Sequence, residues 1–364
     1  MGKNRTKQRW WTKSLAPLLM LNLLLAPALP AMAASKDFTE ESRFRAIAVL
    51  PMRVVNNRIH ILFEVNGVNV EMLLDTGASA TVFFENKTLK PEHFALRDSV
   101  EVSFPAFRAS ATGFRLPTVT LTSGTYEFST DNALFINEDE EVSDQLASKI
   151  DGILGRDFFE AHIVQIDPVA ETVTLVKNGT KIGFGYRHRH AIHMDGGTPY
   201  IIHRSKLPWE AIKTQKKLLL DTGYPGGIVY WDQKQFLQAT SSQEREALEA
   251  QNKGVLYFGL VRFGRLIFRN IPIFISPDAP QKVDDRDGII GATMFRPFRY
   301  AIDFNRNALW LDPITKSYGI GYQISNTVVY TPGNEEFIVK KFATRPHMGA
   351  ITTLVNDKFA IPEN

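Results

Sequence analysis

The sequence predicts a mostly β protein built from two lobes of similar fold, with few helices. Three observations support this prediction. Two motifs each occur twice in the same order, short runs with alternating apolar residues recur along the chain, and clear helical patterns are scarce. A length of 364 residues is enough for two lobes that each bury a core.

The repeat is the strongest of these observations. Leu73-Leu74-Asp75-Thr76-Gly77 recurs further along the chain as Leu219-Leu220-Asp221-Thr222-Gly223. Downstream of the first copy, Asp151-Gly152-Ile153-Leu154-Gly155 recurs as Asp287-Gly288-Ile289-Ile290-Gly291, at a similar offset. The register of this second motif continues to matched residues beyond it, namely Phe159 and Phe295, Ile166-Asp167 and Ile302-Asp303, and Leu175 and Leu311. We therefore predict a duplication within one chain.

The N-terminus has the features of a secretory signal peptide. Five cations and no acid occur up to Lys13, an uncharged apolar run covers residues 14–29, and Ala31-Met32-Ala33 offers small residues for cleavage. The apolar run is shorter than the roughly 20 residues that a stable membrane span needs. We therefore expect removal of residues 1–33 and a periplasmic or secreted mature protein that does not contact the membrane. An uncleaved segment that anchors the protein in the inner membrane is the alternative.

The composition excludes several classes of site. The chain has no cysteine, which rules out disulfides, cysteine-ligated zinc, iron–sulfur clusters, cysteine catalysis and a lipoprotein anchor. Loss of the five N-terminal cations changes the net charge from +3 to −2. Nothing electrostatic in the mature chain therefore points to nucleic acid as a partner.

The mature chain divides into three parts. We assign residues 34–185 to an N-terminal lobe and residues 186–312 to a C-terminal lobe, because Gly, Lys, Arg and His accumulate around residues 178–197. Residues 313–364 have no counterpart in the first lobe and are too few for a typical independent domain. We expect this extension to pack on the lobes and to add strands to a sheet that the lobes share.

Strand patterns dominate both lobes. The alternating runs 61–65 and 68–74 surround Asn66-Gly67, which predicts a β-hairpin whose second strand ends at Asp75. Further strands are expected at residues 119–121, from Phe128 onward, and at residues 163–166, 173–176, 256–258, 266–268, 271–275, 300–304, 309–311, 327–330 and 337–339. A capping box at Ser241 and Glu244 predicts one helix toward Gly254.

The repeated Asp-Thr-Gly motif is the best candidate for chemistry. Each copy places a carboxylate at a turn, beside a glycine that supplies backbone freedom and a threonine whose hydroxyl can bond to another segment. Duplicated lobes can bring Asp75 and Asp221 together across a pseudo-twofold axis. Two carboxyls at one site share a proton, so one can act as a base on water and the other as an acid. Such a pair can add water to an amide without a metal or a covalent intermediate.

On these residues the chain resembles the pepsin/retropepsin-like aspartic proteases, over about residues 45–312. The run from Leu73 to Ser79 is similar to the first-lobe signature of that family, and the run from Ile153 to Asp157 to a retropepsin element. Ile289-Ile290-Gly291 is similar to the end of a pepsin lobe. The resemblance implies a bilobal acid-protease fold of two β-barrel-like lobes, and the missing cysteines fit a bacterial secreted relative. Because one chain holds both motifs, we expect a monomer.

The resemblance also implies roles for individual residues. The catalytic pair would be Asp75 and Asp221, and the supporting residues would be Thr76, Gly77, Thr222, Gly223, Gly155 and Gly291. In the family, the two threonines bond across the lobe interface below the acids, and the last two glycines let a strand pass close to each aspartate loop. These roles predict an aspartic endopeptidase that acts on a peptide or protein substrate and needs no cofactor or metal.

One position departs from the family pattern. Tyr224 follows the second Asp-Thr-Gly, where the family usually has a small residue. Its side chain could narrow the cleft beside the acid, or it could turn outward because Gly226 and Gly227 follow. A non-catalytic peptide-binding protein that keeps the protease fold is therefore the alternative function. The flap that closes over substrate in this family is expected between Phe104 and Arg115.

Four other aspartates repeat between the lobes and are assigned structural roles. Asp151 and Asp287 each precede a glycine at the start of an apolar strand, so we expect them to serve a turn or loop. Asp167 and Asp303 end strands, and we expect them to cap or bond locally.

A cluster of three histidines permits a third hypothesis. His188, His190 and His193 have a spacing that can bind a metal, which would indicate a metal-dependent hydrolase. Two neighbouring arginines disfavour a cation, and no carboxylate between the histidines completes a ligand set. We therefore interpret this tract as a solvated linker between the lobes.

Overall fold

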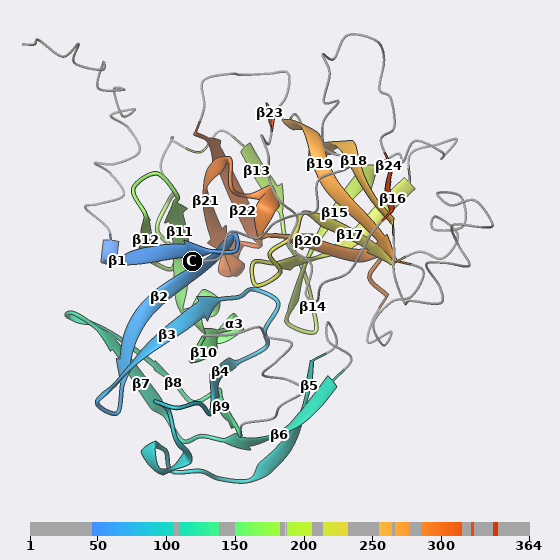
Figure 1. Cartoon of the computed structure of the whole chain (residues 1–364). Coiled ribbons are helices and arrows are strands. Elements are labelled where there is room, and N and C mark those ends of the chain that lie inside the picture. Colours follow the sequence, from blue (N-terminus) through green and yellow to red (C-terminus); the bar gives the residue numbers. More distant parts are fainter. Residues whose placement is uncertain are drawn as a thin grey trace, which may run out of the picture. The chain divides into compact units, whose positions relative to one another are not determined.

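The structure is a computed structural model of the 364-residue chain. It describes residues 46–104, 109–137, 150–182, 186, 188–205, 214–231, 255–263, 266–276, 285–314, 322–323 and 338–340. These residues form mainly strands, with a few short helices (Figure 1), which confirms the predicted mostly β fold. The expected signal peptide, the expected helix near residues 241–254 and the strand expected at 327–330 lie outside the described residues. In the part described, no helix combines the length and the apolar character required to cross a bilayer.

The first sheet contains 15 strands from both repeats. Its members are β1 (Ala46–Val55), β2 (Arg58–Val65), β3 (Val68–Leu74), β4 (Thr81–Phe84), β5 (Ser99–Phe104), β6 (Ala109–Arg115), β7 (Val119–Ser123), β8 (Tyr126–Thr130), β9 (Ala133–Ile136), β10 (Gly152–Leu154), β11 (His162–Asp167), β12 (Thr172–Lys177), β13 (His188–Ala191), β21 (Phe298–Asp303) and β22 (Ala308–Pro313). The main path runs β13-β22-β21-β11-β12-β1-β2-β3-β10-β4-β9-β6-β5, and β7 joins β2 and β8 beside it.

The second sheet contains nine strands, all from the second half of the chain. Its members are β14 (His193–Asp195), β15 (Thr198–Ser205), β16 (Thr214–Asp221), β17 (Ile228–Trp231), β18 (Val255–Phe263), β19 (Leu266–Ser276), β20 (Gly288–Gly291), β23 (Tyr322–Gln323) and β24 (Ile338–Lys340). The helices that the described residues form are α3 (Arg156–Ala161) and the 3-10 turns η1 (Pro91–His93), η3 (Ala292–Met294) and η4 (Phe304–Arg306).

Both repeats build the same four-strand arrangement around their Asp-Thr-Gly motif. In the first repeat, β10 lies parallel to β3 and antiparallel to β4, which in turn lies parallel to β9. In the second repeat, β20 lies parallel to β16 and antiparallel to β17, which lies parallel to β19. The registers agree as well, because Leu73 pairs with Ile153 and Leu219 pairs with Ile289. The two halves therefore share one topology, as the sequence repeat predicts.

The repeats meet where β11 and β21 pair antiparallel in the first sheet. Gln165 faces Ala301, which is its equivalent in the second repeat by the offset that relates Asp151 to Asp287. On either side, Val164 pairs with Ile302, and Ile166 pairs with Tyr300. Exchanging each residue for its repeat equivalent reproduces these pairs. The pseudo-twofold axis of the duplication therefore passes between Gln165 and Ala301.

The alternation of side chains along each strand determines which residues before the aspartate are buried in the main core. Met72 and Leu74 are fully buried in the main core, which also contains Leu218 and Leu220 of the second repeat. Side chains on a strand alternate between its two faces, so Leu73 shares its face with the residue after Leu74. Each buried leucine contributes about 1.5–3 kcal/mol to folding. The same burial that stabilises these strands therefore turns the aspartate to the opposite face.

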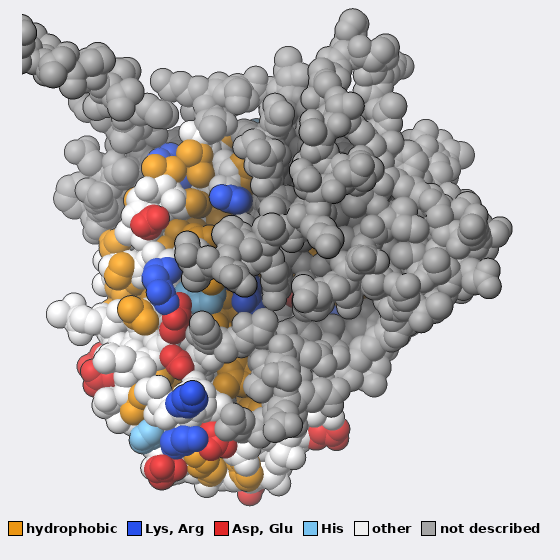
Figure 2. All heavy atoms as spheres, in the orientation of Figure 1, with side chains coloured by type: hydrophobic (Ala, Val, Ile, Leu, Met, Phe, Trp, Pro, Cys, Tyr) orange, Lys and Arg blue, Asp and Glu red, His pale blue; other side chains and the backbone are white. Residues whose placement is uncertain are grey.

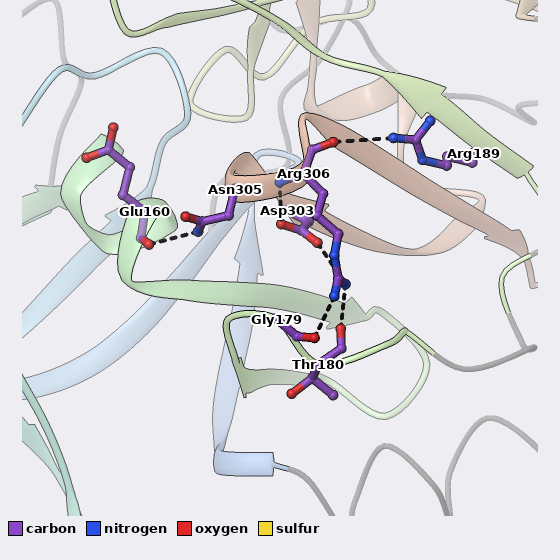
Figure 3. Close-up of polar contacts among 7 residues, drawn as sticks. All are labelled: Glu160, Gly179, Thr180, Arg189, Asp303, Asn305 and Arg306. Atoms are coloured by element: carbon purple, nitrogen blue, oxygen red, sulfur yellow. Dashed lines mark hydrogen bonds and ion pairs between the residues drawn. The ribbon is translucent and has the colours of Figure 1, made fainter.

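Polar contacts near η4 tie the second repeat to the end of the first (Figure 3). The guanidinium of Arg306 donates to the carbonyl oxygens of Thr180 at 2.5 Å and Gly179 at 2.6 Å. The Nδ2 of Asn305 donates to the carbonyl oxygen of Glu160 at 3.1 Å. These bonds to backbone carbonyls fix the turn that follows β12 against η4.

Two hairpin turns of the first repeat use residues with positive φ. Asn66 and Gly67 adopt φ of 50° and 81° between paired Val65 and Val68, which confirms the predicted hairpin. β1 and the turn after it, where Asn56 and Asn57 adopt φ of 50° and 64°, were not predicted from the sequence. Asparagine tolerates this conformation better than most residues, so the Asn-Asn pair was the available signal.

The second half of the chain differs in detail from the expected strands. The two strands expected at 266–268 and 271–275 form one continuous strand, β19. Beyond residue 313, β23 pairs with β19 and β24 pairs with β18, so described parts of the extension add strands to the second sheet. The expected strand at 337–339 corresponds to β24.

The described side chains do not gather one sign of charge on the face in view. Figure 2 shows acidic and basic side chains intermixed there, with hydrophobic side chains between them. Exposed hydrophobic residues of the first sheet include Ile47, Val49, Val54 and Leu62. Isolated exposed apolar side chains are ordinary on protein surfaces.

Candidate active site

The carboxyl groups of Asp75 and Asp221 meet and share a hydrogen bond. Asp75 follows the last residue of β3, and Asp221 ends β16. The backbone N–H of Asp75 donates to the carbonyl oxygen of Leu154 at 3.0 Å, whereas Asp221 is paired with Gly291 across β16 and β20. Each aspartate is thus positioned by the second motif of its own repeat.

Glycines in the two motifs make room for this meeting. A Cβ atom on Gly77 would lie 2.9 Å from the carboxyl carbon of Asp221, and one on Gly223 would overlap the carboxyl of Asp75. Neither glycine has a positive φ. The glycines were expected to supply backbone freedom, but the close approach of the opposite carboxyl is what requires them.

The two threonines form a reciprocal network below the carboxyls. The hydroxyl of Thr76 donates to the carbonyl oxygen of Leu220 at 2.6 Å, and that of Thr222 donates to Leu74 at 2.8 Å. Each hydroxyl also accepts the backbone N–H of the other threonine at 3.0 Å. Both side chains are buried. The structure therefore brings Thr76 and Thr222 together across the repeat interface, as the resemblance implies.

Gly155 and Gly291 lie where a strand passes close to each aspartate loop. A Cβ atom on Gly155 would overlap the backbone of Ala80, and one on Gly291 would lie 2.5 Å from the carbonyl oxygen of Gly226. The following residue anchors the loop in both repeats, because Arg156 donates its N–H to Ala78 at 2.9 Å and Ala292 donates to Tyr224 at 2.8 Å. No side chain larger than hydrogen fits at these two positions without a shift of backbone.

Burial and mutual repulsion set the ionisation of the carboxyl pair. Burial raises the pKa of Asp221 well above its ordinary value, and the charge of Asp75 raises it further. Burial also raises the pKa of Asp75, but hydrogen bonds from Gly77 and Asp221 oppose this effect. The Gly77 N–H donates to Asp75 Oδ1 at 2.7 Å, and the Tyr224 N–H donates to Asp221 Oδ1 at 2.8 Å. These directions favour a pair that holds one proton between its two carboxyls.

The ring of Tyr224 packs back onto its own loop. A Cβ atom on Gly226 would lie 2.5–2.7 Å from the ring and hydroxyl of Tyr224, and one on Gly291 would lie 2.5 Å from its Cδ1. The ring also joins an apolar cluster that includes Val229 and Ile289. Burial raises the pKa of the Tyr224 phenol above its ordinary value, so the hydroxyl stays protonated. The two glycines therefore provide the space in which this large side chain fits.

The aspartates assigned to structure serve the backbone. Asp151 Oδ2 accepts the N–H of Glu71 at 2.6 Å, and Asp287 Oδ2 accepts the N–H of Lys217 at 2.7 Å. Both donors lie on the strand that leads to an aspartate of the pair, four residues before it. Both acids therefore have a structural role, as predicted, but they hold strands rather than a turn.

The second pair of structural aspartates caps the chain locally, as predicted. Asp167 Oδ1 accepts the N–H groups of Val169 and Ala170 at 2.9 and 3.1 Å. Asp303 Oδ1 accepts the N–H of Arg306 at 2.9 Å in η4. These hydrogen bonds do not involve Asp75 or Asp221.

The histidine tract forms strands, so its interpretation as a solvated linker is wrong. His188 and His190 lie on β13, which pairs with β22, and His193 begins β14. Burial lowers the pKa of His190 to about 4. Across the residues that the structure describes, no group of three or more acidic, histidine or cysteine side chains could hold a metal ion.

The region expected to contain the flap is a hairpin. β5 and β6 pair antiparallel from Ser99 with Phe114 to Phe104 with Ala109. Residues 105–108, which connect them, lie outside the described residues. The flap function of this hairpin stays a prediction.

One comparison with known proteins gives a match within the first repeat. Residues 61–158 match the sequence profile of a family described as aspartyl protease, and this segment contains Asp75, Gly77 and Gly155. No curated protein matches the chain at a significant level. Among solved structures, the chain is similar to the crystal structure of basic 7S globulin from soybean, with 9% identity and a TM-score of 0.48 over 75% of this chain and 96% of that chain. The sequence around the first aspartate of the pair is thus similar to an aspartyl protease family.

Proposed function

We propose that the protein is an aspartic endopeptidase whose reaction depends on Asp75 and Asp221. The observation that carries this proposal is the hydrogen bond between two carboxyls that come from different repeats. Hydrolysis by general acid–base catalysis uses one ionised group and one protonated group, and two neighbouring carboxyls can supply both. The match of residues 61–158 to an aspartyl protease family supports the same reaction class.

In the proposed reaction, Asp75 is ionised and Asp221 is protonated at the start. Asp75 removes a proton from water as the water oxygen bonds to the amide carbon, and Asp221 gives its proton to the carbonyl oxygen. The C–N bond of the resulting gem-diol then breaks as the amine nitrogen takes a proton from Asp75, and a hydroxyl proton returns to Asp221. This sequence needs no covalent intermediate and leaves both acids in their starting states.

The setting of this reaction is proposed from the sequence alone. The expected signal peptide at residues 1–33 supports a periplasmic or secreted protein. A peptide or protein is the substrate, and a monomer is sufficient because both aspartates come from one chain.

Substitution of each aspartate tests the proposal. We expect Asp75→Asn and Asp221→Asn each to abolish cleavage in an unbiased peptide library, while Asp98→Asn, at an exposed aspartate, retains it. Unchanged cleavage by both single variants would refute the mechanism. Tight binding of a statine-type transition-state analogue without any cleavage by the unmodified protein would instead indicate the non-catalytic peptide-binding alternative.

A further inference from the structure

We propose that Asn57 is a positioning residue for Asp221, so that a turn of the first repeat holds the loop that carries the aspartate of the second. This inference rests on the proposed function of the carboxyl pair. It concerns a residue that lies outside both Asp-Thr-Gly motifs and was not identified from the sequence.

The side chain of Asn57 reaches the second repeat through three hydrogen bonds. Its Nδ2 donates to Thr293 Oγ1 at 3.0 Å and to the carbonyl oxygen of Pro225 at 3.3 Å. Its Oδ1 accepts a bond from Arg296 Nη1 at 3.3 Å. All three partners follow Asp221 in the sequence, whereas Asn57 precedes even the first Asp-Thr-Gly motif. One half-buried side chain therefore bridges the two repeats.

A short connection leads from these bonds to the carboxyl of Asp221. Thr293 Oγ1 donates to the carbonyl oxygen of Pro225 at 2.7 Å, so this oxygen accepts from both Thr293 and Asn57. Pro225 directly follows Tyr224, whose N–H donates to Asp221 Oδ1 at 2.8 Å. The backbone of Tyr224 lies between this N–H and the Pro225 carbonyl, and its conformation is restricted because a proline follows it. A held Pro225 carbonyl therefore limits how far the Tyr224 segment can move. Asn57 thus acts on the donor that orients Asp221.

The opposite repeat contains an equivalent contact made with different chemistry. His60 pairs with Leu73 and Tyr200 pairs with Leu219, so the registers make Gly197 the equivalent of Asn57. The β14–β15 turn also reaches across the interface, where the carbonyl oxygen of the preceding Gly196 accepts a bond from Arg156 Nη1 at 3.4 Å.

The two contacts differ in whether the turn contributes a side chain. A Cβ atom on Gly197 would overlap the Arg156 guanidinium. The turn therefore has no side chain at this position, which leaves room for the long side chain of Arg156. At the other contact, the turn supplies Asn57 and the receiving residue is the small Thr293. Each repeat therefore uses its β-hairpin turn to support the loop region of the other, and Asn57 is the turn side chain that reaches the second aspartate loop.

The turn itself offers a matched pair of variants. Asn56 and Asn57 both have positive φ, which glycine adopts without strain, but Asn56 is exposed and the described structure gives its side chain no hydrogen bond. Asn57→Gly removes the three bonds and keeps the turn, whereas Asn56→Gly changes the same turn and keeps the bonds. Asn57→Asp retains the acceptor for Arg296 and removes the donor to Thr293 and Pro225.

We expect Asn57→Gly and Asn57→Asp to lower kcat by about tenfold to a hundredfold with little change in KM, because a misplaced catalytic group weakens transition-state interactions. The hydrogen bond from Tyr224 stabilises ionised Asp221, so its loosening moves the basic limb of the pH–rate profile to higher pH. Asn56→Gly should match the unmodified protein in both measurements. Equal kcat values and pH profiles for Asn57→Gly and Asn56→Gly would overturn the inference.

A second measurement keeps the inference testable if the protein does not cleave peptides. Carboxyl-carbon NMR of the protein labelled at aspartate follows the apparent pKa values of the Asp75–Asp221 pair directly. Asn57→Gly should raise the higher of these values and Asn56→Gly should not. A shift without cleavage would refute the endopeptidase but support the positioning role, whereas active protein with unshifted values and unchanged kcat in Asn57→Gly would refute only the positioning role.

Discussion

Thr76 and Thr222 are equivalent residues of the two repeats, and each donates its hydroxyl hydrogen to the strand that carries the aspartate of the other. Thr76 bonds to the carbonyl oxygen of Leu220, and Thr222 bonds to that of Leu74. Their hydroxyls also accept each other's backbone N–H groups. The carboxyl pair therefore lies above a closed, buried network of four hydrogen bonds that belongs equally to both repeats.

Removing one of these hydroxyls should destabilise the protein. Thr76→Val or Thr222→Val keeps the side-chain shape but leaves a buried carbonyl and a buried N–H without their partner, which costs about 1–3 kcal/mol each. Urea unfolding measures the loss, with Thr112→Val at an exposed position of β6 as the control. Because the two hydroxyls share one network, the double variant should lose less than the two single losses together. Unchanged midpoints in both single variants would contradict this role.

The stability of the folded protein should depend on pH through Asp221. Folding raises the pKa of this carboxyl, so the folded state binds the proton more tightly than the unfolded state. Stability from this group is complete below the unfolded pKa of about 4 and is lost as pH rises through the folded value. Asp221→Asn cannot ionise, so its stability relative to the unmodified protein should rise from pH 3 to pH 7, by about 1.4 kcal/mol for each unit of pKa shift. Asp98→Asn, at an exposed aspartate, serves as the control.

Tyr224 should contribute to stability through its packing on Gly226 and Gly291. In the first repeat the equivalent residue is Ala78, so Tyr224→Ala removes a half-buried ring from a loop that tolerates alanine elsewhere. We expect a loss of about 1–3 kcal/mol in stability from the lost packing on Gly226 and Gly291. Because the ring packs on its own loop, we expect little change in the cleavage profile of the peptide library. Tyr224→Phe keeps the ring and should change neither measurement, and an unchanged free energy of unfolding for Tyr224→Ala would contradict this packing role.

Arg306 should contribute to stability without affecting the pH profile of cleavage. Arg306→Met keeps much of the apolar stem but removes the donors to Gly179 and Thr180, and we expect a loss of about 1–3 kcal/mol in thermal or urea unfolding. Lys177→Met, at an exposed residue of β12, serves as the control. A change in the apparent pKa values of the pH–rate profile in Arg306→Met would show that this contact reaches the carboxyl pair.

Local sequence signals predicted the elements whose causes are local. Asn66-Gly67 specifies a two-residue turn because both residues tolerate positive φ, and the flanking alternation specifies the strands. The same reasoning failed for His188–Ala191, where a polar sequence forms a strand because the backbone of β22 is available to pair with it. The contacts of Asn57 could not be predicted from the sequence for a similar reason, because its partners Pro225 and Thr293 lie 168 and 236 residues away.

The amino-acid sequence by itself determined the duplication, the two Asp-Thr-Gly motifs and the mostly β character, because repeats and period-2 alternation are properties of the chain alone. Only the tertiary structure decided that the two carboxyls meet, that glycines are required there by close approach and that Tyr224 folds onto its own loop. The meeting of the carboxyls and the close approach at Gly77 and Gly223 arise from contacts across the pseudo-twofold axis, and such contacts join residues whose separation in the sequence carries no local signal.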